Sequence, residues 1–457
     1  MKHDQRAAQP PDDDMLAADL AHIVHPFSRL DALPATGIPI FVEGRGVRLY
    51  DRSGQEYLDG VSGLYNVQVG YGRQELADAA AAQMAKLSFA QLFFGLGNEP
   101  SIRLAVKLAE ITPLGIERFL FTLSGSDAND TALKLVRYRN ILQGRPKKVK
   151  VIARRHSYHG MTFGAVTATG EDEYKHELGP LIPGFSHIDQ PAPGDPSAPD
   201  VLESRIREEG PDTVAAFIAE PVSLPSGVII PDANYWPRIR EICTRYDVAL
   251  IADEVITGFG RTGKMFGLNH WNVVPDLLVL SKGITSGYLP LGAVGLIESF
   301  YKDLAVPGKV FPHGFTASGH PASCAVALRN IEIIEREGLV EQAVHIGDYL
   351  RRRLDTLQTS SRFIGAVRSL GMLAAIDLVA DGREYGSAGG EARLGQWAAE
   401  TLRERRLIAR FYGDTLVLAP SLVATQPDID EITGHVEEVI MHLLPDFLNS
   451  DASGVRT

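Results

Sequence analysis

Short apolar runs alternate with longer mixed segments through the middle of the chain. The runs lie at 118–123, 149–153, 214–219, 248–252, 277–280 and 291–297, and helical patterns cover 127–143 and 235–246. Continuous apolar runs bounded by polar residues are typical of strands that are buried on both faces of a sheet. The alternation of strands with helices predicts an α/β domain around a mostly parallel sheet. The Pro/Gly-rich stretch 178–200 lacks any such pattern and is expected to be a loop.

The two ends of the chain have a different pattern. Residues 15–24, 74–88 and 100–111 predict helices, and Gly-rich turns within 38–60 predict a small antiparallel meander. Later come helical patterns at 321–337, 340–357, 391–405 and 427–443, strands at 363–369, 372–379 and around 407–419, and a Gly-rich loop at 385–390. This mixture is typical of an α+β arrangement.

The predicted domain division follows from these patterns. We expect a large domain at 69–325 and a smaller domain that combines 15–68 with 326–446. The polar residues 1–14 and 447–457 are expected to be disordered tails.

Composition narrows the class of protein. The chain has 457 residues, of which 45% are hydrophobic and 22% charged, as in ordinary globular proteins. Lys and Arg number 45 against 57 Asp and Glu, a net charge of −12 that disfavours nucleic acid or an anionic membrane as partner. Only two cysteines occur, Cys243 and Cys324, and both lie in apolar helical patterns without a CxxC or His/Cys cluster. We therefore expect both to be core residues of a protein in a reducing compartment. No membrane-length apolar run or signal-peptide pattern is present, so we expect a cytoplasmic protein.

Polar residues follow four of the predicted buried strands. Ser124-Gly125-Ser126 opens a helix, where backbone amides and the helix dipole favour a phosphate, although an ordinary serine N-cap explains the motif equally simply. Glu220, Asp253-Glu254 and Lys282 follow the next strands. In open α/β sheets ligands bind at the carboxyl ends of the strands, so these groups are expected to converge on one crevice.

The polar residues after these four strands can be compared with the requirements of several ligands. No histidine pair has metal-ligand spacing, and no G-x-G-x-x-G follows the first strand for a nicotinamide dinucleotide. Residues 258–264 match the G-x4-G-K spacing of a nucleotide phosphate loop, but Met265 replaces the hydroxyl that would hold Mg²⁺. Pyridoxal phosphate fits each part, because it needs a phosphate cradle, a lysine for its aldehyde and a carboxylate for its ring nitrogen.

Longer motifs in the same order identify a family. SGSDANDT (124–131), SYHG (157–160), AEP (219–221), ADEVITGFGRTG (252–263), SKGITSGYLPLGAV (281–294) and HGFTASGHP (313–321) resemble the motifs of the class III aminotransferases, pyridoxal-phosphate enzymes of fold type I. The resemblance extends from about Phe27 to the last helix. The meander at 38–60, GLYNVQVGYGR (63–73) and ARFYGD (409–414) are similar to the ω-amine:pyruvate branch in particular.

The resemblance implies roles around the cofactor. Lys282 would form the Schiff base with the cofactor aldehyde and later carry a proton between two carbons, and Asp253 would pair with the pyridine nitrogen. The other implied positions are Gly125 and Ser126 at the phosphate, Tyr158 on the ring with His159 behind it, Val255 on the opposite face, Glu220 in support, and Thr316 reaching the phosphate from the partner subunit of a homodimer. For Tyr158 and Val255, simple core packing stays open as an alternative.

The resemblance also implies a substrate pocket. Arg410 would grip the carboxylate of pyruvate and swing away for a carboxylate-free amine. Tyr158 and Tyr65 would line the pocket, with Tyr65 in place of the Trp common in this branch, and Phe93 and Phe94 would enter from the neighbouring subunit. Asp127 stands where the phosphate motif more commonly has Glu, a conservative change.

The implied reaction is transfer of an amino group from an amine or ω-amino acid to pyruvate, forming alanine in a ping-pong reaction through pyridoxamine phosphate. Three alternatives remain: a transaminase for taurine, a diamine or another ω-amino acid; a mutase or decarboxylase of the same fold, which needs no external keto acid; and a non-catalytic descendant. Whether dimers pair into tetramers, which amine is natural and which stereochemistry is preferred are left open.

Overall fold

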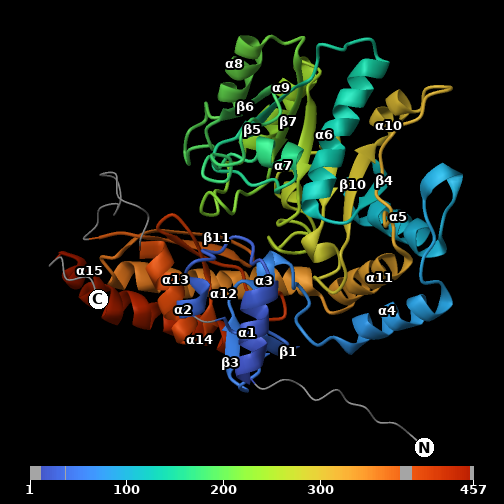
Figure 1. The fold of residues 1–457 in the computed structure, drawn as a ribbon. Coiled ribbons are helices and arrows are strands. Elements are labelled where there is room, and N and C mark those ends of the chain that lie inside the picture. Colours follow the sequence, from blue (N-terminus) through green and yellow to red (C-terminus); the bar gives the residue numbers. More distant parts are fainter. Residues whose placement is uncertain (1–11, 37, 381–393, 453–457) are drawn as a thin grey trace, which may run out of the picture.

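The structure, a computed structural model, describes residues 12–36, 38–380 and 394–452. Its largest sheet has seven strands in the order β4-β10-β9-β8-β7-β5-β6 (Figure 1). The strands are β4 (Ile116–Thr122), β5 (Lys150–Arg154), β6 (Phe185–Ile188), β7 (Val214–Ala219), β8 (Ala249–Asp253), β9 (Leu277–Leu280) and β10 (Gly292–Ile297). Only β10 runs antiparallel to its neighbours, so the predicted mostly parallel sheet is confirmed.

Helices cover both faces of this sheet, which explains the continuous apolar runs. Ala249 and Ile251 pack with residues of α6 (Gly125–Leu142) on one face, whereas Leu250 and Ala252 pack with α9 (Tyr235–Arg245) on the other. Side chains alternate along a strand, so a strand with helices on both sides must be apolar at every position. The remaining helices around the sheet are α4 (Gln74–Lys86), α5 (Glu99–Ile111), α7 (Phe163–Ala168), α8 (Asp200–Glu209), α10 (Glu298–Leu304) and α11 (Pro321–Arg336).

One prediction for this region was wrong. The stretch 178–200 is not entirely loop, because Phe185–Ile188 forms β6, which pairs in parallel with β5 at the edge of the sheet. An edge strand of four residues has few sheet neighbours, and its half-polar pattern Phe-Ser-His-Ile carries no clear strand signal. The short helix α7 and helix α8 were also not predicted.

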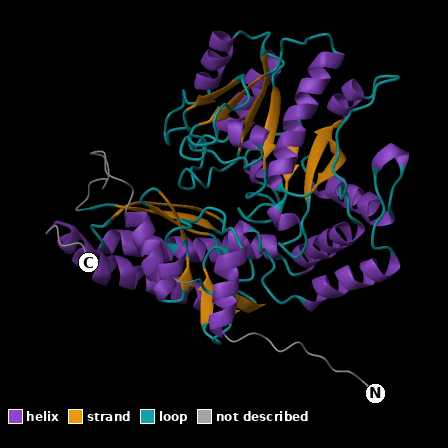
Figure 2. Ribbon diagram, in the orientation of Figure 1, coloured by secondary structure: helices purple, strands orange, loops and turns teal. Residues whose placement is uncertain are grey.

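Both ends of the chain build the second part of the molecule, which Figure 2 shows as a separate group of short strands below the large sheet. One sheet has the order β1-β2-β3-β13 and another the order β11-β12-β15-β14. The strands are β1 (Phe41–Arg45), β2 (Arg48–Asp51), β3 (Glu56–Asp59), β11 (Ile364–Leu370), β12 (Leu373–Leu378), β13 (Leu407–Ile408), β14 (Arg410–Tyr412) and β15 (Thr415–Leu418). The antiparallel meander is confirmed.

The segment 407–412 joins these two small sheets. β13 pairs in parallel with β3, and two residues later β14 pairs with β15 of the other sheet. The predicted strand pair at 407–419 is therefore split between two sheets. This crossing brings β14 to α3 (Ser62–Tyr65), which follows β3: the hydroxyls of Tyr412 and Tyr65 lie 3.3 Å apart.

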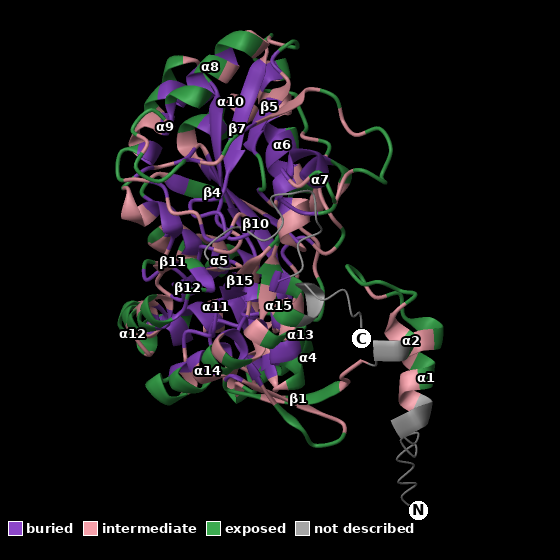
Figure 3. Ribbon diagram, turned by 90° about the vertical axis from the view of Figure 1, so that its left-hand side faces the viewer, coloured by how far each residue is buried: buried purple, intermediate pink, exposed green. Residues whose placement is uncertain are grey.

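The remaining helices are α1 (Asp12–His22), α2 (Leu33–Thr36), α12 (Leu339–Ser360), α13 (Leu394–Glu404), α14 (Gln426–Glu438), a π-helical turn at Val439–Leu443 and α15 (Leu444–Ala452). Figure 3 shows buried residues concentrated in the central strands and helices, whereas α1 and α2 carry exposed and intermediate ones. None of the helices in the described ranges combines the length and apolar character of a membrane span.

The predicted tails and the predicted Gly-rich loop fall partly or wholly outside the described residues. Residues 1–11, the loop 385–390 and 453–457 lie outside them, while 12–14 begin α1 and 447–452 belong to α15 rather than to tails. All seven strands of the large sheet lie within 69–325, and the strands of both small sheets lie outside that range. The domain boundaries themselves stay a prediction.

Candidate active site

A cavity of about 450 Å³ lies at the carboxyl ends of the parallel strands. Its lining includes eight of the residues to which the sequence analysis assigned a role at the cofactor: Gly125, Ser126, Tyr158, His159, Glu220, Asp253, Val255 and Lys282. These residues come from five separate stretches of chain that meet only in the folded sheet. The predicted convergence of the strand ends is thus present in the structure.

Lys282 enters the cavity directly after β9. Burial lowers the pKa of its ammonium group to about 8, although the Asp253 carboxylate acts in the opposite direction. Its backbone has φ +45°, in the left-handed region that a side chain such as lysine rarely adopts. A lysine with a lowered pKa and a strained backbone at a cavity is suited to act as a nucleophile and a proton carrier.

Asp253 ends β8 and is held by a clamp of side chains. Asn129 Nδ2 donates to its Oδ2 at 2.8 Å, and His159 Nδ1 lies 2.8 Å from the same oxygen. Among the residues that the structure describes, Oδ1 accepts only the backbone N–H of Val255, at 3.1 Å. The carboxylate is 4% exposed, so the clamp fixes a buried negative charge in one orientation beside the cavity.

The start of α6 forms another wall. Ser124 caps the helix by accepting the N–H of Asp127 at 3.2 Å, so the ordinary N-cap is present, and Gly125 and Ser126 nevertheless line the cavity. A Cβ at Gly125 would come within 3.0 Å of Val255, so only glycine lets the chain pass here without displacing that side chain. The result is a helix N-terminus that opens into the cavity, with Ser126 providing a hydroxyl group.

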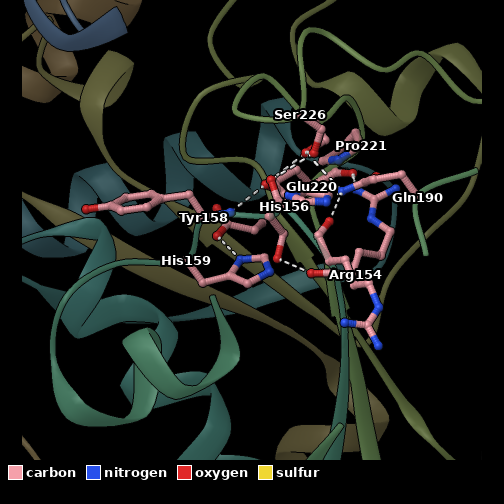
Figure 4. A network of polar contacts seen from close by, with 12 residues as sticks. Arg154, His156, Tyr158, His159, Gln190, Glu220, Pro221 and Ser226 are labelled. Carbon is pink, nitrogen blue, oxygen red and sulfur yellow. Dashed lines mark hydrogen bonds and ion pairs between the residues drawn. The ribbon is translucent and has the colours of Figure 1, made fainter. Parts of the chain in front are cut away.

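Glu220 supports the loop that carries Tyr158. Its Oε1 accepts the Tyr158 backbone N–H at 3.1 Å, and its Oε2 forms an ion pair with the fully buried Arg154 at 3.2 Å. Figure 4 shows this network, with the Tyr158 ring pointing away from the group formed by Arg154, Gln190 and Glu220. Glu220 therefore positions Tyr158 by accepting the backbone N–H of that residue, and the Tyr158 ring is free to line the cavity.

Glu254, next to Asp253, faces the other way. Its carboxylate accepts the N–H groups of Gly267 at 2.7 Å and Leu268 at 2.8 Å, together with the Thr257 hydroxyl. Burial raises the pKa of Glu254 to about 7. Because successive side chains of a strand point to opposite faces, only the first of the two acids reaches the cavity.

Arg410 and Tyr65 lie beside the cavity rather than in its lining. The guanidinium of Arg410 is half-buried and is close enough to Lys282 to influence the pKa of that ammonium. Tyr65, 3% exposed, places its hydroxyl 3.3 Å from the hydroxyl of Tyr412. Arg410 and Tyr412 are two positions apart on β14 and so share one face of the strand.

Thr316, Phe93 and Phe94 do not line the cavity of their own chain. Thr316 is exposed on the loop before α11, and Phe94 is 91% exposed with φ +58°. Phe93 packs against Gly314, where a Cβ would come within 2.6 Å of its ring. The predicted contributions from a partner subunit are compatible with this placement and stay predictions.

Sequence reasoning missed several residues of the site. Asn129 lies four positions after Gly125, one helical turn, so the helical period could have placed it on the cavity side. Tyr412 could have been found from its two-residue spacing to Arg410. Leu64, Asn66, Thr285, Gly287 and Pro290 also line the cavity; they lie within the motifs 63–73 and 281–294, but their uncharged side chains gave no reason to assign them to the site.

The arrangement fits pyridoxal phosphate, which the sequence resemblance implies. A lysine with a lowered pKa suits an aldehyde, and a clamped carboxylate suits a protonated ring nitrogen. The amides at the start of α6 and the Ser126 hydroxyl suit a phosphate. Two buried polar atoms of the clamp, Asn129 Oδ1 and His159 Nε2, have no partner among the described residues, so the clamp retains unused hydrogen-bonding capacity.

Comparisons with known proteins agree with this chemistry. The family model described as aminotransferase class-III matches residues 34–440. A putrescine–pyruvate aminotransferase of Pseudomonas aeruginosa is 41% identical over 424 residues, 90% of this chain and 92% of that protein. A diaminobutyrate–2-oxoglutarate transaminase of Halomonas elongata is 38% identical over 420 residues, which are 88% of this chain and 90% of that protein. The crystal structure of an (S)-enantioselective omega-transaminase from Thermomicrobium roseum matches with a TM-score of 0.89 at 40% identity, over 94% of this chain and 98% of that chain.

Proposed function

The chain belongs to the class III aminotransferases, pyridoxal-phosphate enzymes of fold type I, and we propose that it moves the amino group of an amine or ω-amino acid to pyruvate, forming alanine. The reaction has two halves, with the amine reacting first and the keto acid second. The similarity to a putrescine–pyruvate aminotransferase supports pyruvate as the acceptor. Membership of the family alone does not decide the keto acid, because another relative is named for 2-oxoglutarate.

The chemistry divides between the cofactor and the protein. Pyridoxal phosphate supplies an aldehyde carbon that bonds to amines and a protonated ring that withdraws electrons. We assign the proton transfers to Lys282 Nζ, which becomes a neutral base above its pKa of about 8. Asp253 would keep a proton on the ring nitrogen of the bound cofactor, and Asn129 and His159 hold Asp253 in place.

The single observation that carries the choice of a carboxylate acceptor is the state of Arg410. Among the described residues its guanidinium has neither a hydrogen-bond partner nor an ion pair, although it is half-buried beside Lys282. A half-buried arginine without a carboxylate partner is costly unless a ligand supplies one. Arginine binds carboxylates in a bidentate manner, so a keto acid such as pyruvate would complete the site.

We also propose that the active unit is a homodimer. Large apolar side chains are exposed along α4, the segment 87–95 that follows it and α5, including Met84, Phe89, Phe94 and Ile102. An exposed apolar surface of this kind is typical of an interface between subunits. In the dimer Thr316, Phe93 and Phe94 would reach the partner's site.

The two cysteines are buried and unpaired, which supports a cytoplasmic location.

The experiment is an amine panel with pyruvate as acceptor. Putrescine, β-alanine, taurine and 1-phenylethylamine are each incubated with the cofactor-loaded protein, and alanine is measured. Alanine formation that requires both amine and pyruvate supports the proposal, and the rates rank the donors. Amine consumption without pyruvate would instead indicate a mutase or decarboxylase, and alanine from none of the donors would refute the proposal.

A further inference from the structure

A second cavity, of about 610 Å³, lies at the opposite edge of the large sheet from the active site. It is lined by the three segments that lead into β5, β7 and β8, namely 144–148, 211–212 and 245–247. None of these lining residues belongs to the lining of the active-site cavity. β5 and β7 have five and six residues, so at 3.3 Å per residue the two cavities lie about 17–20 Å apart. We refer to the second cavity as the basic cavity.

Positive charge dominates the lining of the basic cavity. Its charged side chains are four cations and two carboxylates: Arg145, Lys147, Lys148, Arg245, Asp212 and Asp247. The lining therefore has a surplus of two positive charges, whereas the whole chain has a net charge of −12. A concentration of positive charge in a cavity of an acidic protein favours an anionic ligand.

The two arginines of the lining already have carboxylate partners. Arg145 forms an ion pair with Asp247, and Arg245 lies 2.9 Å from Oε1 of Glu203 on α8. Even so, the buried Nε of Arg145 has no hydrogen-bond partner among the described residues. The ion pairs therefore fix both guanidinium groups at the cavity and leave one buried N–H donor for a ligand.

Lys148 has the greatest need of an anion. Its side chain is buried, with the residue 4% exposed, and burial lowers the pKa of its ammonium group. Nζ donates at 3.0 Å to the backbone oxygen of Tyr246, the C-cap residue of α9. This bond uses one of three ammonium donors, and Lys148 forms no ion pair among the residues that the structure describes. A buried charge without a counter-charge is costly, so an anion in the basic cavity would stabilise it.

Phosphate matches both the charge and the size of the basic cavity. A phosphate monoester carries about 1.5 to 2 negative charges at pH 7 and three strong acceptor oxygens, which compares with the surplus of two positive charges. Ammonium and guanidinium donors are the usual protein partners of phosphate. The rest of the lining includes the half-buried Tyr246 and the apolar Pro146 and Pro211. These residues leave room beside a phosphate group for a small organic group.

We propose that the basic cavity is a binding site for a phosphate group, supplied either as free phosphate or by a small organic phosphate ester, with Lys148 as its central contact. Lys148 Nζ and Arg145 Nε would donate to the phosphate oxygens, and the exposed Lys147 would add a second ammonium group at the rim. The site goes beyond the aminotransferase reaction, because it shares no residue with the active-site cavity.

The test is a calorimetric titration of the cofactor-loaded protein. Borohydride reduction first fixes the cofactor to the protein, so that the phosphate subsite of the active site cannot become free for the probe. Inorganic phosphate, glycerol 2-phosphate and adenosine monophosphate are titrated at constant ionic strength, because salt screens exposed charges. We expect saturable binding of one phosphate group per chain. Tighter binding of either ester would identify an ester as the ligand, and equal or tighter binding of inorganic phosphate would identify free phosphate.

Three variants locate the binding. Lys148→Met keeps the length of the side chain, removes its charge and should weaken phosphate binding at least about tenfold, the loss for a hydrogen bond between charged groups. Lys147→Ala changes an exposed side chain at the rim and should weaken binding about threefold. The matched control is Lys264→Met, which removes one positive charge from an exposed position that lines neither cavity and should leave the affinity unchanged.

The alternative role of Lys148 is to cap the end of α9 by its bond to Tyr246, without any ligand. A cap alone predicts that folded Lys148→Met binds phosphate as the wild type does, and that result would overturn the proposal. No saturable binding to the wild type up to about 10 mM phosphate would also overturn it, as would an equal loss in Lys264→Met. If circular dichroism shows that Lys148→Met does not fold, Lys147→Ala decides, and an unchanged affinity there would contradict the site.

Discussion

Replacing Arg410 by alanine should separate carboxylate acceptors from neutral ones. The guanidinium has no internal partner among the described residues, so its hydrogen-bonding capacity is available to the substrate. A hydrogen bond to a charged group contributes about 1.5–3 kcal/mol. Because Arg410 is only half-buried, we take the lower value for each of the two bonds of a bidentate contact. The total of about 3 kcal/mol corresponds to a loss of about 100-fold in kcat/KM for pyruvate.

The assay compares pyruvate with butanal as acceptor, using the same saturating amine. Arg410→Ala should lose about 100-fold in kcat/KM for pyruvate and less than threefold for butanal, which has no carboxylate. Arg403→Ala is the control, since it removes one positive charge from the exposed surface of α13 and should affect neither acceptor. Equal losses for pyruvate and butanal would refute the role of Arg410 and would point to a disturbed β14 instead.

Further predictions concern the cofactor and the dimer. Lys282→Ala should keep the circular dichroism of the wild type while losing both turnover and the visible absorbance of the lysine-bound cofactor; retained turnover would contradict the assignment. The rate at which apoprotein binds pyridoxal phosphate covalently should rise with pH with a midpoint near 8, because only the neutral form of Lys282 is nucleophilic; a midpoint near the ordinary 10.5 would contradict the lowered pKa. Asn129→Ala should weaken cofactor binding about tenfold in a fluorescence titration. Asn140→Ala should not, because Asn140, a buried residue of the same helix, donates its side-chain hydrogen bond to Val136 O within that helix. Phe94→Asp should yield monomers in sedimentation velocity, with lower activity; an unchanged dimer would place the interface elsewhere.

The strand ends of the large sheet could be predicted from the sequence because the sheet is covered on both faces. Apart from Asp253, which closes β8, the central strands β7, β8 and β9 are apolar throughout, so the polar residues that follow these runs mark the carboxyl edge. That rule located Glu220, Asp253 and Lys282. It could not separate Asp253 from Glu254, since only the direction of each side chain shows that the second acid turns towards Gly267 and Leu268.

Contacts between distant parts of the chain were harder to predict. The G-x4-G-K stretch contains Arg261, which is fully buried and bonds to the backbone oxygens of Ala419 and Pro420 and to the Ser62 hydroxyl at 2.7 Å. The stretch therefore joins the large sheet region to both ends of the chain. The hydroxyl contact of Tyr65 with Tyr412 spans 347 positions and depends on the pairing of β3 with the two-residue strand β13. The sequence predicted strands around 407–419 but not that β3 is the partner of the first.

The central claim is that Lys282 holds the cofactor in a cavity where Asp253 faces its ring. Borohydride reduction of the cofactor-loaded protein makes that bond permanent, and peptide mass mapping then locates it. The account predicts a pyridoxyl group on the peptide that contains Lys282 and on no other lysine. A pyridoxyl group on a different lysine, or a protein that carries none after reduction, would contradict it.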